Sequence, residues 1–216
     1  MLINEIFHSI QGESTLSGFP FIFIRLQGCN LRCPYCDTKD SLDTSSGKEM
    51  SISEILSEIN KYKCKNILLT GGEPLEQKVE LIELLNILLK KKYTINLETN
   101  GSLLLENIPP KVKKIVDIKG PSSGVDLESG LWEKNLSYLT KKDELKFLTS
   151  DKIDFEWAVE FIKKNSLDKK ECCINVSPIH SKCNMKILSK WILDSGLDIR
   201  LNLQIHKIIW GNSRGK

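Results

Sequence analysis

Three cysteines on one short segment are the residues of this chain whose types and spacing predict chemistry most directly. Cys29, Cys33 and Cys36 have the spacing C-x3-C-x2-C and follow an apolar run at 21–26. Thiolates suit iron–sulfur clusters, and a 4Fe-4S cluster held by three cysteines leaves one iron open to a ligand that the protein does not supply. An open iron can take part in a reaction, so residues 28–38 are predicted to form a reactive cluster loop.

A structural zinc site is the alternative interpretation of the same three cysteines. Its fourth ligand would be a distant residue such as Cys64, Cys183 or His180. Structural zinc is commonly held by two paired half-sites, and the sequence has no second C-x2-C. The cluster is therefore favoured, and the other cysteines are expected to be small buried side chains: Cys64, Cys172, Cys173 and Cys183.

An aromatic residue, Tyr35, stands directly before the last of the three cysteines. With it, the motif resembles the signature of the radical S-adenosylmethionine superfamily. The resemblance implies that S-adenosylmethionine binds the open iron and that one electron from the cluster releases a 5'-deoxyadenosyl radical. The cofactor would then carry the difficult chemistry and the protein would direct it, so no side chain is expected to be the catalyst.

Several further segments make the resemblance more particular. The N-terminal fifth contains FHSIQGES at 7–14, FIRLQGCNL at 23–31 and YCDT at 35–38. Later segments are TGGEP at 70–74, ETNG at 98–101, DIKGPSSG at 117–124 and QIHK at 204–207. Together they resemble the 7-carboxy-7-deazaguanine synthases, which act in 7-deazapurine and queuosine biosynthesis.

That resemblance implies a reaction on 6-carboxy-5,6,7,8-tetrahydropterin, a small-molecule substrate. Hydrogen abstraction, ring contraction and loss of ammonia would give 7-carboxy-7-deazaguanine. It also implies a magnesium ion with Thr38 as its protein ligand, an electron donor such as flavodoxin or ferredoxin, and a homodimer. A hydroxyl is a hard oxygen donor, and magnesium keeps several waters, so a single protein ligand is chemically reasonable.

The substrate has a guanidine-like edge and a carboxylate, which need different partners. Gln11 and Glu13 are expected to face the edge, and the guanidinium of Arg25 to bind the carboxylate bidentately. The simpler alternatives are that Arg25 only neutralises the cluster and that Glu13 only pairs with a lysine. The full set of substrate residues that the resemblance implies is Ile10, Gln11, Gly12, Glu13, Arg25 and Thr70.

Residues at the ends of several strands are expected to bind S-adenosylmethionine. Gly72 lacks a side chain where a backbone must approach the amino acid part of the cofactor, and Glu73 and Pro74 would fix that turn. The alternative is that these are ordinary polar residues at strand ends. The expected set is Tyr35, Asp37, Gly72, Glu73, Glu98, Asp117, Lys119, Ser177 and Pro178.

Alternating strand and helix patterns position these residues. Short apolar runs, beginning with 21–26 and ending with 199–205, alternate with amphipathic helices at 75–92, 154–165 and 184–195, and a capping box at 51–54 opens another helix. Polar residues follow the runs at their C-terminal ends, as in a (β/α) barrel. A closed barrel typically needs about 250 residues. The prediction is therefore an α/β fold with a partial, splayed TIM-like barrel of about six parallel strands and an N-terminal hairpin, and a flat doubly wound sheet is the alternative.

Composition limits the other possibilities. With 216 residues, of which 40% are hydrophobic, the whole chain 1–216 is expected to be a single radical S-adenosylmethionine domain. Its only loop-rich insertion, 120–130, would be either a solvent-exposed loop or a functional lid. The net charge is +3, the lysines are scattered and aromatics make up 7%, so no nucleic-acid partner is expected.

Compartment and function class follow from other features of the sequence. Seven cysteines without a secretory signal indicate a reducing compartment, the cytoplasm, and no apolar run reaches the roughly 20 residues that span a membrane. A glycyl-radical activating enzyme, whose substrate is another protein, shares the cysteine spacing, but QGE at 11–13 and CDT at 36–38 speak against it. A non-enzymatic zinc module is the remaining alternative.

Overall fold

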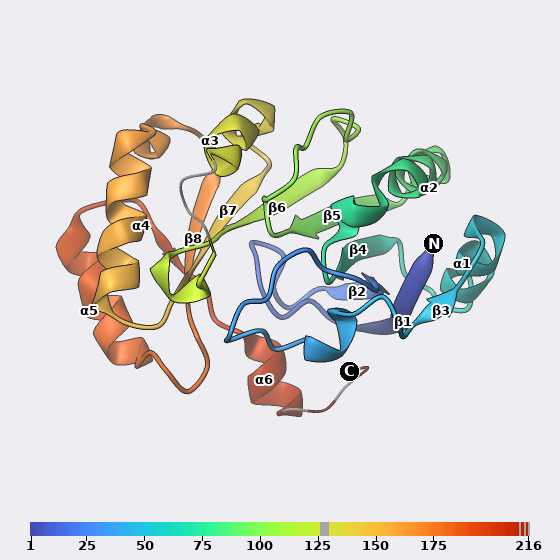
Figure 1. Cartoon of the computed structure of the whole chain (residues 1–216), viewed down its shortest axis with the longest axis horizontal. Helices are drawn as coiled ribbons and strands as arrows, with labels where there is room; N and C mark the ends of the chain where they lie inside the picture. The colour runs from blue at the N-terminus through green and yellow to red at the C-terminus, as the bar shows by residue number, and fades with distance from the viewer. Residues whose placement is uncertain (126–129, 212, 214, 216) are drawn as a thin grey trace.

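The described strands form one curved sheet of nine, in the order β3-β1-β2-β4-β5-β6-β7-β8-β9 (Figure 1). The seven strands from β2 to β9 in this order pair parallel, and β1 pairs antiparallel with both β2 and β3. The structure is a computed structural model that describes residues 1–125, 130–211, 213 and 215. The strands are β1 Leu2–Ile10, β2 Pro20–Leu26, β3 Lys48–Glu49, β4 Asn66–Gly71, β5 Thr94–Thr99, β6 Lys113–Ile118, β7 Glu144–Thr149, β8 Cys173–Pro178 and β9 Arg200–Leu201.

This sheet confirms the predicted partial barrel. Its outermost strands are β3 and β9, so the sheet does not close on itself. The N-terminal hairpin is also confirmed, because β1 and β2 pair antiparallel while β2 and β4 pair parallel. The parallel strands all end at the same edge of the sheet, where the polar residues predicted from the sequence are gathered.

The described residues form six α-helices that connect or follow the strands. They are α1 Ile52–Ile59, α2 Lys78–Lys90, α3 Leu131–Asn135, α4 Lys152–Lys164, α5 Met185–Ser195 and α6 Ile205–Trp210. Helices α1, α2, α4 and α5 lie outside the curved sheet (Figure 1). No helix formed by the described residues has the length and apolar composition that crossing a membrane requires.

Local side-chain chemistry sets the helix starts. The capping box predicted at 51–54 is present, with the Ser51 hydroxyl accepting from the Glu54 backbone N–H. Asp151 caps α4, and Asn184 caps α5 in the same way. The helix predicted at 75–92 is shorter at its start, because the first turn after Pro74 is a 3-10 helix and α2 begins at Lys78.

Alternation along each strand separates a helix-facing side from an interior side. In β7, Leu145 and Phe147 are buried on the helix side, where Phe147 packs edge-on against Phe161 of α4 at 5.9 Å between ring centroids. Lys146 and Leu148 point to the interior and line a cavity there. The sheet therefore carries its apolar core on one side and its chemistry on the other.

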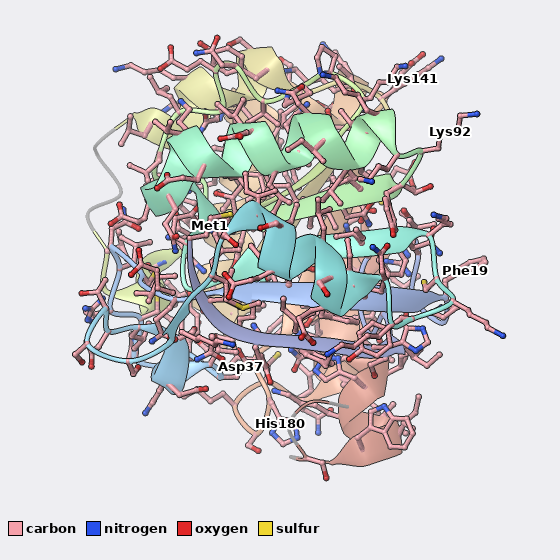
Figure 2. The ribbon with its side chains drawn as sticks, turned by 90° about the vertical axis from the view of Figure 1, so that its right-hand side faces the viewer. Met1, Phe19, Asp37, Lys92, Lys141 and His180 are labelled. Atoms are coloured by element: carbon pink, nitrogen blue, oxygen red, sulfur yellow. The ribbon has the colours of Figure 1, made fainter. Side chains whose placement is uncertain are left out.

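Aromatic side chains of β1 and β2 pack together in the barrel interior. Phe21, Phe23 and Leu68 form a small buried cluster of their own, and Phe7 stacks on Phe23 at 4.7 Å between ring centroids. The end of the barrel where the parallel strands begin lies at the right-hand side of Figure 2, where the labelled Phe19, Lys92 and Lys141 precede β2, β5 and β7. Polar groups also lie near the strand starts, where the buried Glu144 at the start of β7 pairs with Lys113 of β6 and accepts from Asn175 of β8.

The loop 11–19 between β1 and β2 spans the open side of the sheet. Its Ser14 backbone N–H donates to Asn202 after β9 at 3.0 Å, and its Thr15 hydroxyl donates to Glu144 of β7 at 2.6 Å. These contacts join the first hairpin to the last strands. The barrel gap is thus closed by a loop rather than by strand pairing.

The prediction of a last strand over 199–205 is wrong for the second half of that range. Only Arg200 and Leu201 form the strand β9, and Ile205 begins helix α6. The chain leaves the sheet because the Ile205 N–H donates to the Gly12 carbonyl at 3.0 Å instead of to β8. Within the predicted insertion 120–130, a 3-10 turn forms at Pro121–Ser123, and 126–129 lie outside the described residues.

Asn202 should contribute strongly to stability because it joins the loop to the sheet. Its side chain is 1% exposed, accepts from the Ser14 N–H and donates to the Ser177 hydroxyl at 2.9 Å. Asn202→Ala leaves both groups buried without that partner, so the free energy of unfolding should fall by about 2–4 kcal/mol. Anaerobic urea unfolding followed by circular dichroism would measure this change.

Asn60→Ala is the matched control, because Asn60 is exposed and its side chain accepts only a 3.4 Å hydrogen bond from Tyr93. Its effect should stay within about 0.5 kcal/mol. Equal losses in the two variants would show that the loop does not depend on Asn202.

Candidate active site

A cavity of about 440 Å³ lies at the C-terminal ends of the parallel strands. Its wall is made by the end of β1, the cluster loop, the ends of β2 and β4 to β8, and helix α6. The predicted site residues that line it are Ile10, Gln11, Gly12, Glu13, Arg25, Cys29, Cys33, Tyr35, Cys36, Asp37, Thr38, Thr70, Gly72, Glu98, Asp117, Lys119 and Pro178.

The cluster loop leaves β2 and is held by its own backbone. The Gly28 N–H donates to the Ser41 carbonyl at 2.9 Å, and the Cys29 N–H donates to the Leu42 carbonyl at 3.0 Å. A turn is closed by the Cys36 N–H and the Cys33 carbonyl at 3.1 Å. All three thiols are free and line the cavity.

The three thiols fit an iron–sulfur cluster, because they come from one loop and line one cavity. A four-iron cluster binds each thiolate to a different iron. Burial raises the pKa of the Cys29 and Cys33 thiols, and metal binding would release their protons.

The zinc alternative loses two of its three candidate ligands. The Cys64 thiol donates to the carbonyl of Pro20 at 3.3 Å, at the start of β2, whereas Cys29 follows its end. Seven strand residues separate the two ends by roughly 20 Å. Cys183 does not line the cavity, and of the three only His180 does.

Gly72 lacks a side chain for a reason that differs from the predicted one. A Cβ at Gly72 would overlap the Gly28 carbonyl oxygen and lie 2.6 Å from the Ser41 carbonyl oxygen. The neighbouring Glu73 N–H donates to the same Gly28 carbonyl at 2.8 Å. The close approach is therefore made first by the cluster loop of the protein itself.

The Glu73 side chain does not line the cavity, although the sequence predicts that this residue contacts the cofactor. Its carboxylate is fully buried and accepts from the Leu75 N–H at 2.9 Å, the Thr99 hydroxyl at 2.7 Å and the Asn100 N–H at 2.6 Å. Burial outweighs these bonds and raises the pKa of Glu73 to about 7. The residue joins the loops after β4 and β5.

Ser177 is the second predicted residue that the structure leaves out of the cavity. Its side chain is fully buried, and its hydroxyl accepts from Asn202. Pro178, the next residue and the last of β8, does line the cavity. Successive residues of a strand point to opposite faces of the sheet. Ser177 therefore fixes the end of β8.

Arg25 lies in the cavity wall with its guanidinium held on one side. Its Nε donates to Glu5 of β1 at 2.9 Å, and the two residues are direct partners across the hairpin. Its Nη amines donate to no other residue in the described part of the chain. A partly fixed guanidinium with free donors fits a ligand carboxylate.

Glu13 has a lysine partner, as one of the simpler alternatives anticipated. Its carboxylate pairs with Lys146 of β7 and accepts from Gln204 at 2.6 Å. Burial raises the pKa of Glu13, but the positive charge of Lys146 and the hydrogen bonds outweigh it, so the pKa is lowered overall. Glu13 is held as a carboxylate that faces the cavity.

Gln11 and Gly12 complete this wall. Gln11 is 2% exposed, and its Nε2 has no partner among the described residues although its Oε1 accepts from the Glu13 N–H at 3.2 Å. An unpaired buried donor beside a cavity fits a ligand acceptor. A Cβ on Gly12 would overlap the His206 ring, so this glycine lets helix α6 approach.

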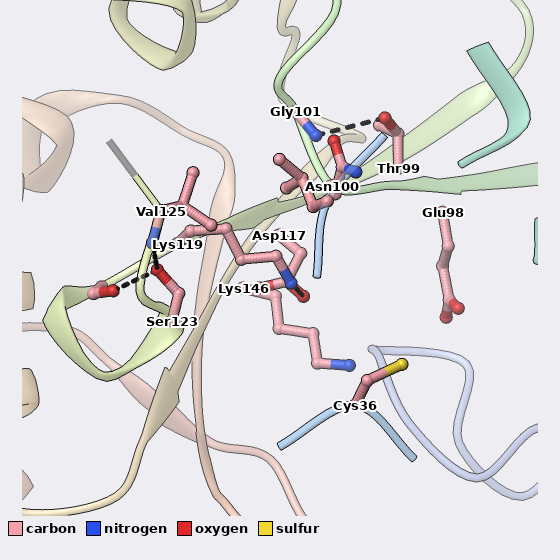
Figure 3. Close-up of polar contacts among 12 residues, drawn as sticks. Cys36, Glu98, Thr99, Asn100, Gly101, Asp117, Lys119, Ser123, Val125 and Lys146 are labelled. Carbon is pink, nitrogen blue, oxygen red and sulfur yellow. Dashed lines mark hydrogen bonds and ion pairs between the residues drawn. The ribbon is translucent and has the colours of Figure 1, made fainter. Parts of the chain in front are cut away.

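Figure 3 shows four charged residues of the cavity wall, Glu98, Asp117, Lys119 and Lys146. Lys119 donates to Asp117 at 2.6 Å and lies 5.9 Å from the centre of the Tyr35 ring. Thr70 donates to Glu98 at 3.1 Å, and burial raises the pKa of Glu98 to about 7. This wall offers acceptors and donors to a polar ligand.

The residues whose roles the sequence did not predict lie on β7, the loop after β5 and α6. Lys146 is a charged residue inside an apolar strand, and that pattern could have identified it. Asn100, Gln204, His206 and Lys207 all line the cavity. Lys207 pairs with Asp37 of the cluster loop at 3.4 Å, which places α6 over the cavity.

Comparisons with known proteins agree with this site. The Radical SAM superfamily matches residues 23–176. A 7-carboxy-7-deazaguanine synthase from Koribacter versatilis is 40% identical over 224 residues, which cover 97% of each chain, and one from Clostridium acetobutylicum is 40% identical over 220 residues, covering 99% of this chain and 98% of its own. The crystal structure of QueE from Escherichia coli is similar with a TM-score of 0.74 and 27% identity, covering 94% of this chain and 93% of that chain.

Gly72→Ala should displace the cluster loop, since the new Cβ overlaps backbone atoms that cannot turn aside. The variant should retain less than about half of the parent iron after anaerobic reconstitution, because misplaced thiolates lose metal. Gly120→Ala is the control, because its Cβ would meet only ordinary contacts, the nearest at 3.4 Å. Iron and sulfide per chain measure the effect, and full iron in Gly72→Ala would contradict the close-approach explanation.

Proposed function

The chain belongs to the radical S-adenosylmethionine superfamily and, within it, to the 7-carboxy-7-deazaguanine synthases, and from this we propose the reaction that it catalyses. It converts 6-carboxy-5,6,7,8-tetrahydropterin to 7-carboxy-7-deazaguanine with loss of ammonia, in 7-deazapurine (queuosine) biosynthesis. The observation that carries the proposal is one cavity that contains the three cluster cysteines, an arginine with free donors and a buried Gln11–Glu13 wall.

The proposed roles divide the cavity between cofactor and substrate. Cys29, Cys33 and Cys36 would hold the 4Fe-4S cluster, which together with bound S-adenosylmethionine supplies the radical that starts the reaction. Tyr35, Gly72 and the strand ends around Asp117 surround the same space as these cysteines. Their location supports a role in holding S-adenosylmethionine.

The pterin edge is the part of the substrate that Glu13 and Gln11 suit. That edge presents N–H donors and a carbonyl acceptor side by side. A charged carboxylate accepts the donors, and the unpaired Nε2 of Gln11 donates to an acceptor. Ile10, Gly12 and Thr70 belong to the same wall of the cavity.

Arg25 suits the other end of the substrate. Its free Nη amines would bind the carboxylate at C6 and so hold the neighbouring hydrogen in place for abstraction. The ion pair with Glu5 fixes the guanidinium plane from behind. This division puts the cation on β2 and the Gln11–Glu13 wall in the loop before that strand.

Thr38 is the proposed ligand of a magnesium ion. Its side chain lines the cavity, with Oγ1 3.7 Å from the Cys36 sulfur. Thr38 would hold the ion through its hydroxyl oxygen, a hard donor of the kind that magnesium prefers.

Wider features of the protein are proposed on the same basis. One sheet with helices on its outer side supports a single domain over residues 1–216. Seven cysteines, all free, support a reducing compartment, the cytoplasm. A homodimer and an electron donor such as flavodoxin or ferredoxin follow from the family.

Anaerobic turnover tests the function directly. Reduced, reconstituted protein incubated with S-adenosylmethionine and 6-carboxy-5,6,7,8-tetrahydropterin should give 7-carboxy-7-deazaguanine, identified by mass. Cys33→Ala should bind less iron and give no product, whereas Cys64→Ser should keep both, since Cys64 lies far from the cavity. No product from iron-loaded parent protein would refute the proposal.

Arg25→Lys keeps the charge but loses the two-pronged donor geometry. Product formation should fall by on the order of 100-fold, because a small misplacement slows a positioned reaction by that amount. Cleavage of S-adenosylmethionine without substrate should remain near the parent value. If cleavage and iron content fall together with product, Arg25 supports the cluster and not the substrate.

Thr38→Ala should weaken the response to magnesium, because it removes a hard oxygen and no thiolate. The magnesium concentration for half-maximal rate should rise by about tenfold, while iron content stays at the parent value. Thr44→Ala is a control in the segment that follows the cluster loop, outside the cavity. An unchanged magnesium titration would show that Thr38 is not a ligand.

A further inference from the structure

Lys146 is a buried cation in the middle of the cavity wall. It lies on β7, on the interior side of the strand, between the core residues Leu145 and Phe147. Its side chain is 15% exposed and extends toward the side of the cavity that holds Glu98 and Cys36 (Figure 3). A lysine in such a place requires anionic partners.

Its direct partner is Glu13. The Lys146 ammonium pairs with one carboxylate oxygen of Glu13, and Gln204 donates to the other at 2.6 Å. Asp117 is the neighbour of Lys146 across the β6–β7 pair, but its Oδ2 is already bound by Lys119. The ion pair with Glu13 is therefore the direct contact of the ammonium, and the charge of Asp117 favours the same position.

Other charges face Glu13 from three further elements. Glu98 on β5, Asp37 on the cluster loop and His206 on α6 all act on it electrostatically. Two of these groups are acidic and oppose a charge on Glu13, and burial opposes it as well. Lys146 is the close cation that balances them.

We propose that Lys146 is a positioning residue for the substrate, acting through Glu13: it keeps that carboxylate charged and fixed so that it accepts the adjacent N–H donors of the pterin edge. The inference rests on the proposed function, and it adds a basis for specificity. A charged, oriented carboxylate favours a ring with an amino group beside a ring N–H. A ring without that amino group leaves a carboxylate oxygen unpaired.

The pH dependence distinguishes this role from a purely structural one. Without Lys146, burial and the neighbouring acids would raise the pKa of Glu13, and the carboxyl would be protonated at neutral pH. A protonated carboxyl donates on one oxygen and no longer accepts two N–H bonds. Raising the pH restores the carboxylate, so the defect should shrink as pH rises.

Anaerobic steady-state kinetics between pH 6 and 9 would test the inference with Lys146→Met. At pH 7 the KM for the pterin should rise about tenfold or more, and the rise should diminish toward pH 9. Discrimination against an analogue without the 2-amino group should fall.

Two further variants test the route through Glu13. Lys146→Arg should have a KM close to the parent value. In a Glu13→Gln background, Lys146→Met should raise the KM by less than about a further twofold.

Matched measurements separate this role from other effects. Lys114→Met removes another buried lysine, paired with Asp143 at 3.1 Å but outside the cavity, and its KM should stay at the parent value. Cleavage of S-adenosylmethionine without substrate should be unaffected by Lys146→Met. If this variant does not hold the cluster, Lys146→Gln should show the same shift with pH.

Three results would overturn the inference. They are an unchanged KM, a loss that is equal at every pH, or a full further loss in the Glu13→Gln background. An unchanged KM would mean that Lys146 does not act in substrate binding, and either of the other two results would mean that it acts on the substrate or on folding without Glu13. Absence of product from the parent protein would instead refute the proposed function, and the inference with it.

Discussion

The site depends on one backbone contact, between the cluster loop and the turn after β4. The Gly28 carbonyl lies where a Cβ of Gly72 would be, and it accepts the Glu73 N–H. The buried Glu73 carboxylate extends this contact to β5 through the N–H of Asn100. The Asn100 side chain in turn lies 3.8 Å from the Cys29 sulfur. The ends of three strands thus fix the cysteine loop before any cofactor binds.

Buried charge is the second constraint. The charged side chains of the cavity wall are largely shielded from water, so each must pair with an opposite charge or face a ligand. They are Lys146, Glu13, Lys119 and Asp117. Phe23 and Leu68 of the small apolar cluster also line the cavity and add an apolar surface to it. Pairing therefore orients the side chains and leaves selected atoms, such as the Gln11 Nε2, free for a ligand.

The sequence predicted what depends on local pattern. Cysteine spacing, strand periodicity and the capping box at 51–54 are local, and the corresponding loop, strands and helix are present. It did not predict where Glu73 and Ser177 point, because an acid or hydroxyl at a strand end can face either side. It also missed the role of Lys146 and helix α6. Their partners, Glu13 and Gly12, lie more than 130 residues away in the chain, and residue type alone does not reveal such pairs.

The gap on one side of the splayed barrel leaves room for side chains of the loop 11–19. Strand pairing across the gap would place backbone there, whereas the loop 11–19 brings side chains from the hairpin to β7 and to the residues after β9. Because Gly12 has no side chain, His206 can pack against the same loop, and Lys207 reaches Asp37 on the cluster loop. The elements that close the fold are therefore those that face the substrate. Stability and recognition are joined in this protein because Glu13 and Gly12 take part in both.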